Sequence, residues 1–362
     1  MKITGIDLHT VPVNHRGSWT FVLINTDEGI HGLGELNPSG LQRGCDAILE
    51  QMADTLIGRD PCHIEALIQS LNPEGLDYTS VLALSAIDQA LWDILGKVLN
   101  VPLYQILGGR CHEDIHVYAN INRATVDRTP RGFAINAEKA VAQGFDAIKL
   151  APFDGLKSGI DDTADAMQGL SCMREVRQAI GPDVNLLIDC HSHFTVPGAL
   201  RIADALRDLN LYWFEEPLPF EDIDGYRQIR QQLDLPLAGA EGRQLRQGFW
   251  DVLVHEMMDV VMPDVTIVGG ISELRKVADM AQSKGITTAP HGPFGPVALA
   301  AGIQTMVAHP GFQILEYAWG EVPWREDLIT PVEEIHNSRI KPSHLPGLGV
   351  ELNMKTLHRL TQ

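Results

Sequence analysis

Three acidic residues stand at equal intervals in the middle of the chain, and each one closes a short apolar run. They are Asp189, Glu215 and Glu241, so each interval is 26 residues long. An interval of this length accommodates a strand, a helix and two loops, which is the repeating unit of a (β/α) barrel. The C-terminal strand ends of such a barrel face one mouth, where three carboxylates would repel one another unless a cation lay between them. The spacing therefore predicts a divalent metal site.

Length and pattern together predict two structural units. The chain has 362 residues, whereas a barrel of this kind needs about 250. Eight apolar segments, the number that a closed barrel needs, are candidate strands. These segments are residues 115–121, 145–150, 185–190, 211–215, 236–241, 258–263, 286–289 and 312–316. We therefore predict an α/β fold in which a (β/α)7–8 TIM-type barrel occupies residues 113–320.

The remaining residues predict an α+β capping domain. Three segments with alternating polarity, residues 3–13, 21–25 and 30–35, indicate a small antiparallel sheet. Apolar residues at helical spacing predict a helix over residues 80–99. We expect residues 1–112 to form the capping domain, and the C-terminal segment 321–362 to return to it.

Composition limits the partners of the chain. A formal net charge of −19 argues against nucleic acid or an anionic membrane as a partner. No run of 18 apolar residues and no signal-like amino terminus occurs, so we expect no membrane association and a cytoplasmic location. The five cysteines are scattered, which favours reduced thiols. Cys190 is expected to point away from the site, because its neighbours at 189 and 191 point toward it.

The three spaced acids suit Mg²⁺ better than zinc, because Mg²⁺ prefers oxygen ligands and no Cys or His belongs to the set. Glu215 closes its apolar run and is the expected ligand, whereas the adjacent Glu216 is expected to form a supporting ion pair. The alternative for each acid is a residue of the barrel rim that pairs with a lysine.

Two histidines and a further acid stand near other predicted strand ends. His291 follows the seventh strand and Asp264 the sixth, so a pair in which the carboxylate fixes the imidazole tautomer is expected. His191 lies two residues after Asp189, which places both on one face of the strand end, beside the metal.

Glu316 closes the eighth predicted strand, from where it could donate a hydrogen bond to an oxyanion. Lys149 ends the second predicted strand. It could hold a substrate carboxylate or act as a base if its pKa were lowered. The alternative for Lys149 is an ion pair with one of the metal carboxylates.

This set of residues resembles the enolase superfamily, and within it the mandelate racemase subgroup, over essentially the whole chain. The resemblance rests on the acidic triad, the segment Trp213-Phe214-Glu215-Glu216-Pro217, the Asp264 and His291 pair, and Glu316. It implies that a carboxylate substrate binds Mg²⁺ and that a base removes the proton next to the carboxylate.

Two details resemble the acid-sugar dehydratases of the galactonate dehydratase type. The first detail is that the usual Lys-x-Lys of the second strand is Lys149-Leu150-Ala151 here, so the second lysine is absent. The second detail is that His191 stands two residues after Asp189. The resemblance implies that His291 is the base and Asp264 its partner, that His191 protonates the departing 3-hydroxyl, and that Glu316 stabilises the enolic intermediate. An aldonate such as galactonate, gluconate or a pentonate would give a 2-keto-3-deoxy acid.

Weaker expectations concern substrate contacts and assembly. The loop over residues 14–19 is the expected lid, with Arg16 and Trp19 near the distal hydroxyls of the acid sugar. His193 is a further candidate for a substrate contact. A homo-oligomer, from dimer to octamer, is expected.

Three other functions remain open from the sequence. The His191-Ser192-His193 segment has the spacing of a zinc hydrolase site, which would leave the acidic spacing unexplained. A silent scaffold would not need the triad. Racemisation or epimerisation of an α-hydroxy acid would use His291 on one face of the substrate and Lys149 on the other.

Overall fold

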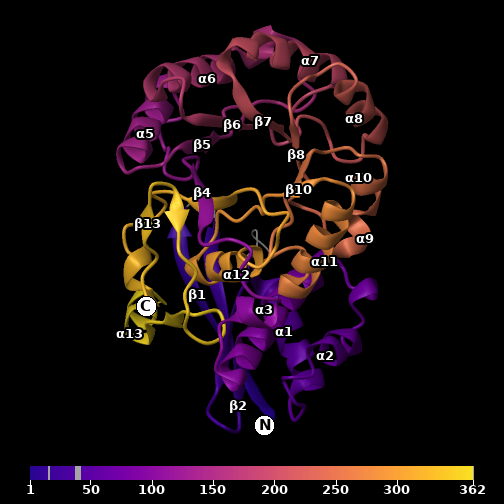
Figure 1. Cartoon of the computed structure of the whole chain (residues 1–362), viewed down its shortest axis with the longest axis vertical. Helices are drawn as coiled ribbons and strands as arrows, with labels where there is room; N and C mark the ends of the chain where they lie inside the picture. The colour runs from indigo at the N-terminus through magenta and orange to yellow at the C-terminus, as the bar shows by residue number, and fades with distance from the viewer. Residues whose placement is uncertain (15–16, 37–41, 362) are drawn as a thin grey trace.

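The chain forms a barrel with a smaller unit of sheet and helices packed against it (Figure 1). This computed structural model describes residues 1–14, 17–36 and 42–361. In Figure 1 the barrel occupies the upper part of the view, and the indigo-to-purple N-terminal unit lies below it. Every helix within the described residues is too short or too polar to cross a lipid bilayer.

Eight parallel strands make the wall of the barrel, in the order predicted. They are β4 (Ile115–Asn120), β5 (Ala147–Leu150), β6 (Asn185–Asp189), β7 (Leu211–Glu215), β8 (Leu237–Gly239), β9 (Val260–Val261), β10 (Thr287–Thr288) and β11 (Leu315–Ala318). β11 pairs with β4, and a bridge between Thr288 and Phe312 joins β10 to the segment before β11. The predicted (β/α)7–8 barrel is confirmed, although several strands are shorter than expected.

Helices connect these strands on the outside of the barrel (Figure 1). They are α5 (Pro130–Ala142), α6 (Met167–Ile180), α7 (Val196–Ala205), α8 (Ile223–Arg230), α9 (Leu245–Gly248), α10 (Trp250–Val254), α11 (Gly270–Ser283) and α12 (Pro296–Met306). After β11 the chain leaves the barrel and enters the C-terminal tail.

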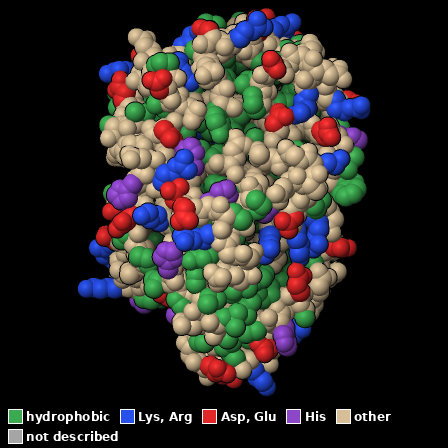
Figure 2. All heavy atoms as spheres, in the orientation of Figure 1, with side chains coloured by type: hydrophobic (Ala, Val, Ile, Leu, Met, Phe, Trp, Pro, Cys, Tyr) green, Lys and Arg blue, Asp and Glu red, His purple; other side chains and the backbone are tan. Residues whose placement is uncertain are grey.

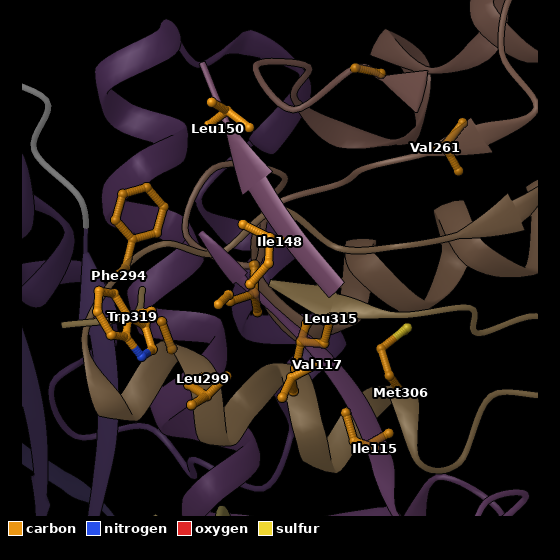
Figure 3. Close-up of a cluster of buried hydrophobic side chains, with 14 of the residues drawn as sticks. Ile115, Val117, Ile148, Leu150, Val261, Phe294, Leu299, Met306, Leu315 and Trp319 are labelled. Carbon is orange, nitrogen blue, oxygen red and sulfur yellow. The ribbon is translucent and has the colours of Figure 1, made fainter. Parts of the chain in front are cut away.

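Side chains alternate between the inside of the barrel and its helix-covered outside, as the two-residue period of a strand requires. Ile148 and Leu150 pack in the outer hydrophobic core (Figure 3), whereas Trp213 belongs to the cluster inside the barrel. Glu215, two residues after Trp213, shares its inward face. Cys190 is fully buried in the outer core, so the prediction that it points away from the site is confirmed.

The N-terminal unit contains the predicted antiparallel sheet and helix. Its sheet has the order β1, β2, β3. The elements of this unit are β1 (Ile3–Asn14), β2 (Gly17–Thr26), β3 (His31–Leu36), α1 (Gln42–Leu56), α2 (Ile64–Ser70), α3 (Tyr78–Leu99) and α4 (Leu103–Ile106). Helix α3 begins at Asp77, whose side chain accepts from the Ser80 N–H, and ends at Asn100, which adopts a left-handed conformation.

Helix α3 lies directly on strand β3 because two glycines remove the side chains between them. A Cβ atom on Gly34 would come within 2.0 Å of the Ala86 carbonyl oxygen, and one on Gly32 within 2.0 Å of the Ala90 carbonyl oxygen. Backbone therefore meets backbone, and nearly every face of α3 is buried.

Two buried carboxylates of the N-terminal unit bind the N-termini of barrel helices. Asp88 on α3 accepts from the backbone N–H of Ser272, at 2.9 Å, and from its hydroxyl, in the first turn of α11. Glu35 on β3 accepts from the N–H groups of Gly295, Val297 and Ala298 at the start of α12. The first N–H groups of a helix lack partners within the helix, and the helix dipole favours negative charge there.

The C-terminal tail contacts both units. Its elements are β12 (Ile329–Thr330), β13 (Ile335–His336), β14 (Arg339–Ile340), β15 (Glu351–Leu352) and α13 (Met354–Thr361). The β13 and β14 hairpin pairs with barrel strand β4, whereas α13 packs against β1. The tail thus reaches the N-terminal sheet through α13, as expected, whereas its β13 and β14 hairpin extends the sheet of the barrel.

The Glu35 contact generates a prediction for stability. Glu35→Ala leaves three buried N–H groups without an acceptor, so we expect the free energy of unfolding to fall by about 3 kcal/mol. The measurement is urea unfolding at pH 8.5, because burial raises the pKa of Glu35 to about 7 and this pH keeps the carboxylate ionised. Glu50 is exposed on α1, and Glu50→Ala should change stability by less than about 0.5 kcal/mol. Equal effects of the two substitutions would contradict this role.

Candidate active site

The three equally spaced acids meet at one point of the barrel mouth. Asp189 ends β6, Glu215 ends β7, and Glu241 lies two residues beyond the end of β8. One carboxylate oxygen from each residue lies within 4.8 Å of the other two. Asp189 and Glu215 are buried, and Glu241 is partly exposed. The structure thus brings together the residues that the sequence spacing groups.

Glu241 reaches this point from a loop and not from a strand end as predicted. Ala240, immediately before it, has a positive φ of 80°, which turns the chain after β8. Glu216 stabilises the turn, because its Oε1 accepts from the N–H groups of Ala240 at 3.0 Å and Glu241 at 3.3 Å. These two hydrogen bonds take the place of the ion pair expected for Glu216. Burial and the neighbouring Glu241 charge raise the pKa of Glu216 to about 8.

Lys149 is the buried counter-charge of the site. Its Nζ lies 2.8 Å from Glu215 Oε1, 2.9 Å from Glu316 Oε1 and 4.0 Å from Asp189 Oδ2. Burial by itself lowers the pKa of Lys149, but Glu215 and Glu316 together raise it well above its usual value. The geometry therefore matches the ion-pair alternative for Lys149, and it does not match a base with a lowered pKa.

The oxygen donors of the triad fit a divalent cation such as Mg²⁺. Asp189, Glu215 and Glu316 lie within 4.0 Å of the ammonium of Lys149, and Glu241 adds a fourth carboxylate where the triad converges. Burial raises the pKa of Glu215 well above its usual value, and Asp189 and Glu241 add to this despite Lys149. In the described part of the chain, Glu241 Oε2 is buried without a hydrogen-bond partner. Excess negative charge on buried oxygen donors is the condition that a hard cation satisfies.

His291 and Asp264 form the predicted pair. His291 Nδ1 lies 2.6 Å from Asp264 Oδ2, and Asp264 Oδ1 accepts at 2.7 Å from both the N–H and the hydroxyl of Thr266. A carboxylate only accepts, so Nδ1 carries the proton and Nε2 faces the site, 3.3 Å from Glu241. Burial lowers the pKa of His291, but Glu241, Glu316 and Asp264 together raise it to about 10.

These two residues lie farther from the strands than the sequence predicted. Asp264 is three residues beyond the end of β9, and His291 three residues beyond the end of β10. Both therefore belong to the loops that lead into α11 and α12, whose first turns are held by Asp88 and Glu35.

His191 contacts Asp189, whereas His291 contacts Glu241. His191 Nε2 lies 2.7 Å from Asp189 Oδ2, and its Nδ1 contacts the carboxylate of Asp154. The backbone of His191 has a positive φ of 42°, and its N–H donates to Asp189 Oδ1. Burial lowers the pKa of His191, but Asp189 and Asp154 raise it to about 12.

Asp154 and Arg128 support His191, and sequence reasoning missed both. Arg128 Nη2 donates to Asp154 Oδ2 at 3.1 Å and to the Ala151 carbonyl oxygen at 2.6 Å. Neither residue belongs to a strand end or to a motif, so only the fold reveals their contact with His191. Ala151 stands where the family pattern has a second lysine. Its backbone carbonyl oxygen accepts from Arg128.

Glu316 accepts hydrogen bonds and does not donate them. It is the second residue of β11 and not the last residue of a strand, as was predicted. Its Oε1 accepts from Asn120 and lies next to Lys149, and its Oε2 accepts from the Gly292 N–H at 3.0 Å. These partners correct the expectation that Glu316 donates to an oxyanion. It instead links Lys149 to the loop that carries His291.

A cavity of about 280 Å³ opens over Asp189, Glu241 and both histidines. Sequence reasoning missed most of its other lining residues. The lining residues are Tyr78, Asn120, Asn122, Arg123, Asp189, His191, Glu241, Gly242, Ile267, His291, Pro293 and Phe294. Asn120 and Asn122 were detectable in principle, because they are polar residues at the end of an apolar strand. Tyr78 comes from the N-terminal unit, so no local pattern indicated it.

Of the three predicted substrate contacts, Trp19 and His193 do not line this cavity. Arg16 lies outside the described residues. Trp19 is 2% exposed and packs edge-on against Trp324, with ring centroids 5.4 Å apart, so it is a core residue. His193 is half-buried and does not line the cavity. The expectation for Trp19 was wrong because the strand β2 that carries it turns this side chain inward.

Comparison with known families identifies the chain. Residues 6–108 match the family described as mandelate racemase / muconate lactonizing enzyme, N-terminal domain. Residues 132–356 match the one described as enolase C-terminal domain-like. The chain belongs to the enolase superfamily. The recognition made from the sequence is therefore confirmed.

Similar proteins carry the names of acid-sugar enzymes. A D-xylonate dehydratase from Haloferax volcanii is 32% identical, over 96% of this chain and 86% of that protein. A D-galactonate dehydratase from Ralstonia nicotianae is 33% identical, over 98% and 92%. A D-galactarolactone cycloisomerase from Agrobacterium fabrum is 33% identical, over 99% and 98%.

A solved structure has the same fold. The mandelate racemase/muconate lactonizing enzyme from Jannaschia sp. CCS1 superposes with a TM-score of 0.91 at 27% identity, over 100% of this chain and 98% of that chain. The likeness covers both the barrel and the N-terminal unit.

The position of Lys149 generates a prediction. Lys149→Met keeps the length of the side chain but leaves Glu215 and Glu316 without their buried counter-charge, so we expect a loss of about 4 kcal/mol in the free energy of unfolding. The measurement is urea unfolding in metal-free buffer. Lys355 is exposed on α13, and Lys355→Met is the matched control, expected to have no effect beyond about 0.5 kcal/mol. A similar loss in both variants would refute the counter-charge role.

Proposed function

We propose that this protein is a Mg²⁺-dependent dehydratase of an acid sugar, an aldonate such as galactonate, gluconate or a pentonate. One observation carries the proposal: His191 and His291 contact opposite ends of one row of carboxylates, through Asp189 and Glu241. A base at one end and an acid at the other are what elimination of water from neighbouring carbons requires. The names of the similar proteins support the substrate class.

Asp189, Glu215 and Glu241 would hold the Mg²⁺ ion. When bound, Mg²⁺ supplies positive charge that stabilises the negative charge developing on the substrate carboxylate as the C2 proton leaves. The N–H groups that bind Glu216 and the salt bridges of Lys149 keep Glu241 and Glu215 in place before substrate arrives.

His291 removes the C2 proton with Nε2. Asp264 accepts from Nδ1, so Nε2 is the nitrogen that exchanges its proton with the site. The charge of Glu241 contributes to the raised pKa of His291, so His291 becomes the neutral base when a bound cation offsets that charge. Thr266 donates two hydrogen bonds to Asp264, which prevents that carboxylate from rotating away. The imidazolium that forms is stabilised by the charge of Asp264.

His191 protonates the 3-hydroxyl as the bond between C3 and oxygen breaks. Hydroxide is a poor leaving group, so the departing oxygen needs a proton. Asp154 contacts Nδ1 of His191 and Arg128 holds Asp154, which leaves Nε2 directed at the site. Water departs, the enol that remains gains a proton at C3 from solvent, and the product is a 2-keto-3-deoxy acid.

Lys149 is not placed to act as the second base that racemisation or epimerisation would require. Lys149 is 1% exposed, contacts two carboxylates and does not line the cavity. Position 151 is an alanine. The similar cycloisomerase shares the scaffold, so the identity of the product decides between the reactions.

The proposal predicts turnover of at least one acid sugar. The purified protein is screened with five- and six-carbon aldonic acids and Mg²⁺, and 2-keto acid is measured by semicarbazide absorbance. Chelation should abolish turnover, and added Mg²⁺ should restore it, because the ligands are all oxygens. Racemase activity on an α-hydroxy acid without any 2-keto product, or activity restored by zinc alone, would overturn the proposal.

Deuterium exchange at C2 is predicted to distinguish the roles of the two histidines. His291→Asn should lower dehydration by at least about 10²-fold and abolish deuterium exchange at C2, because both need the base. His191→Asn should block dehydration to a similar extent but retain exchange, since only the departure of the hydroxyl needs the acid. His255 is exposed and remote, so His255→Asn is the control. If exchange survived in His291→Asn and vanished in His191→Asn, the two roles would be exchanged.

A further inference from the structure

A partly buried ion pair lies at the cavity and takes no part in the proposed proton transfers. Arg123 lies three residues beyond β4 and lines the cavity. Its Nη1 donates to Glu321 Oε1 at 2.9 Å, and the two side chains are 17% and 0% exposed. The guanidinium carbon lies 5.3 Å from the centroid of the Phe294 ring, so the aromatic face fixes its plane as well.

This pair retains unused hydrogen-bonding groups of both kinds. A guanidinium has five N–H donors, and within the described residues only Nη1 of Arg123 has an acceptor. Glu321 Oε1 accepts from Arg123 and from Asn14 Nδ2 at 3.0 Å. Its Oε2 is buried and has no hydrogen-bond partner among the described residues. Glu321 is 0% exposed and does not line the cavity, so of this pair only Arg123 presents its unused donors to a ligand, and the buried charge of Glu321 balances that of the guanidinium.

The pair lies toward the N-terminal unit, away from the reacting groups. Asn14, which binds Glu321, is the last residue of β1. Neither Arg123 nor Glu321 has a hydrogen bond or salt bridge to the triad, His191 or His291 among the described residues. On the face of the molecule that Figure 2 shows, acidic, basic and histidine side chains are interspersed. Arg123, Asp189 and Glu241 line the same cavity, so a substrate whose carboxylate lies at the triad can reach Arg123 with its other end.

We propose that Arg123 and Glu321 form a subsite for the end of the acid sugar remote from its carboxylate, and that this subsite takes a neutral hydroxyl in preference to a second carboxylate. The inference rests on the proposed function and narrows it. A hydroxyl can accept from Arg123, whose positive charge the buried Glu321 already balances. A second carboxylate can only accept, and the charge of Glu321 repels it. Aldonic acids are thus selected over aldaric acids.

The test compares two substrates in three proteins. The substrates are the best aldonic acid of the screen and the aldaric acid of the same length and configuration, and the quantity is the ratio of their kcat/KM values. Glu321→Gln removes the repelling charge and keeps an acceptor, so kcat/KM for the aldaric acid should rise by about 10-fold relative to the aldonic acid. Arg123→Lys keeps the charge but loses the planar fork, so KM for the aldonic acid should rise by about 10-fold with a smaller change in kcat.

Controls separate this inference from the proposed function. Arg207 is exposed and pairs with Asp204 at 2.6 Å, and Arg207→Lys should leave the kcat/KM values of both substrates unchanged. If Glu321→Gln fails to fold, the KM effect of Arg123→Lys decides the question. Absence of turnover by the unaltered protein would overturn the proposed function together with the subsite. Turnover with an unchanged substrate ratio in Glu321→Gln, or an unchanged KM in Arg123→Lys, would overturn the subsite alone.

Discussion

The contact between buried carboxylates of the N-terminal unit and the first turns of two barrel helices is the interaction on which the active site depends. Asp88 binds the start of α11 and Glu35 the start of α12. The loop that carries Asp264 leads into α11, and the loop that carries His291 leads into α12. Free N–H groups at a helix start bind negative charge. The N-terminal unit therefore positions the two members of the His–Asp pair, although it contributes neither.

Charge balance links the remaining parts of the site. Lys149 contacts Glu215 and Glu316, and Glu316 in turn accepts from Gly292, the neighbour of His291. One ammonium does not balance all of these carboxylates, and the excess negative charge lies where the triad converges. One buried ammonium thus holds the strand ends together and leaves a site for a cation beside the imidazole of His291. The two histidines lie at the edges of this excess negative charge, where their contacts with Asp189 and Glu241 direct them toward the same cavity.

Much of the barrel was predictable because strand periodicity is local. The alternation that buries Cys190 outside and directs Glu215 inside follows from a two-residue period. Positions after the strands were less predictable, since loop geometry decides them. Glu241 depends on the positive φ of Ala240 and on its contact with Glu216. Trp19 was misplaced because an aromatic residue near a loop has the same local pattern whether it covers a ligand or fills the core.

The sequence by itself determined the fold class, the repeat that carries the acidic residues and the family, because each of these is written in spacings along one stretch of chain. Only the tertiary structure decided which side chains support the reacting ones. Arg128 and Asp154 meet at His191, and Arg123 meets Glu321 across nearly two hundred residues. Such contacts arise when separate loops pack against one another, and neither a strand period nor a motif encodes that packing.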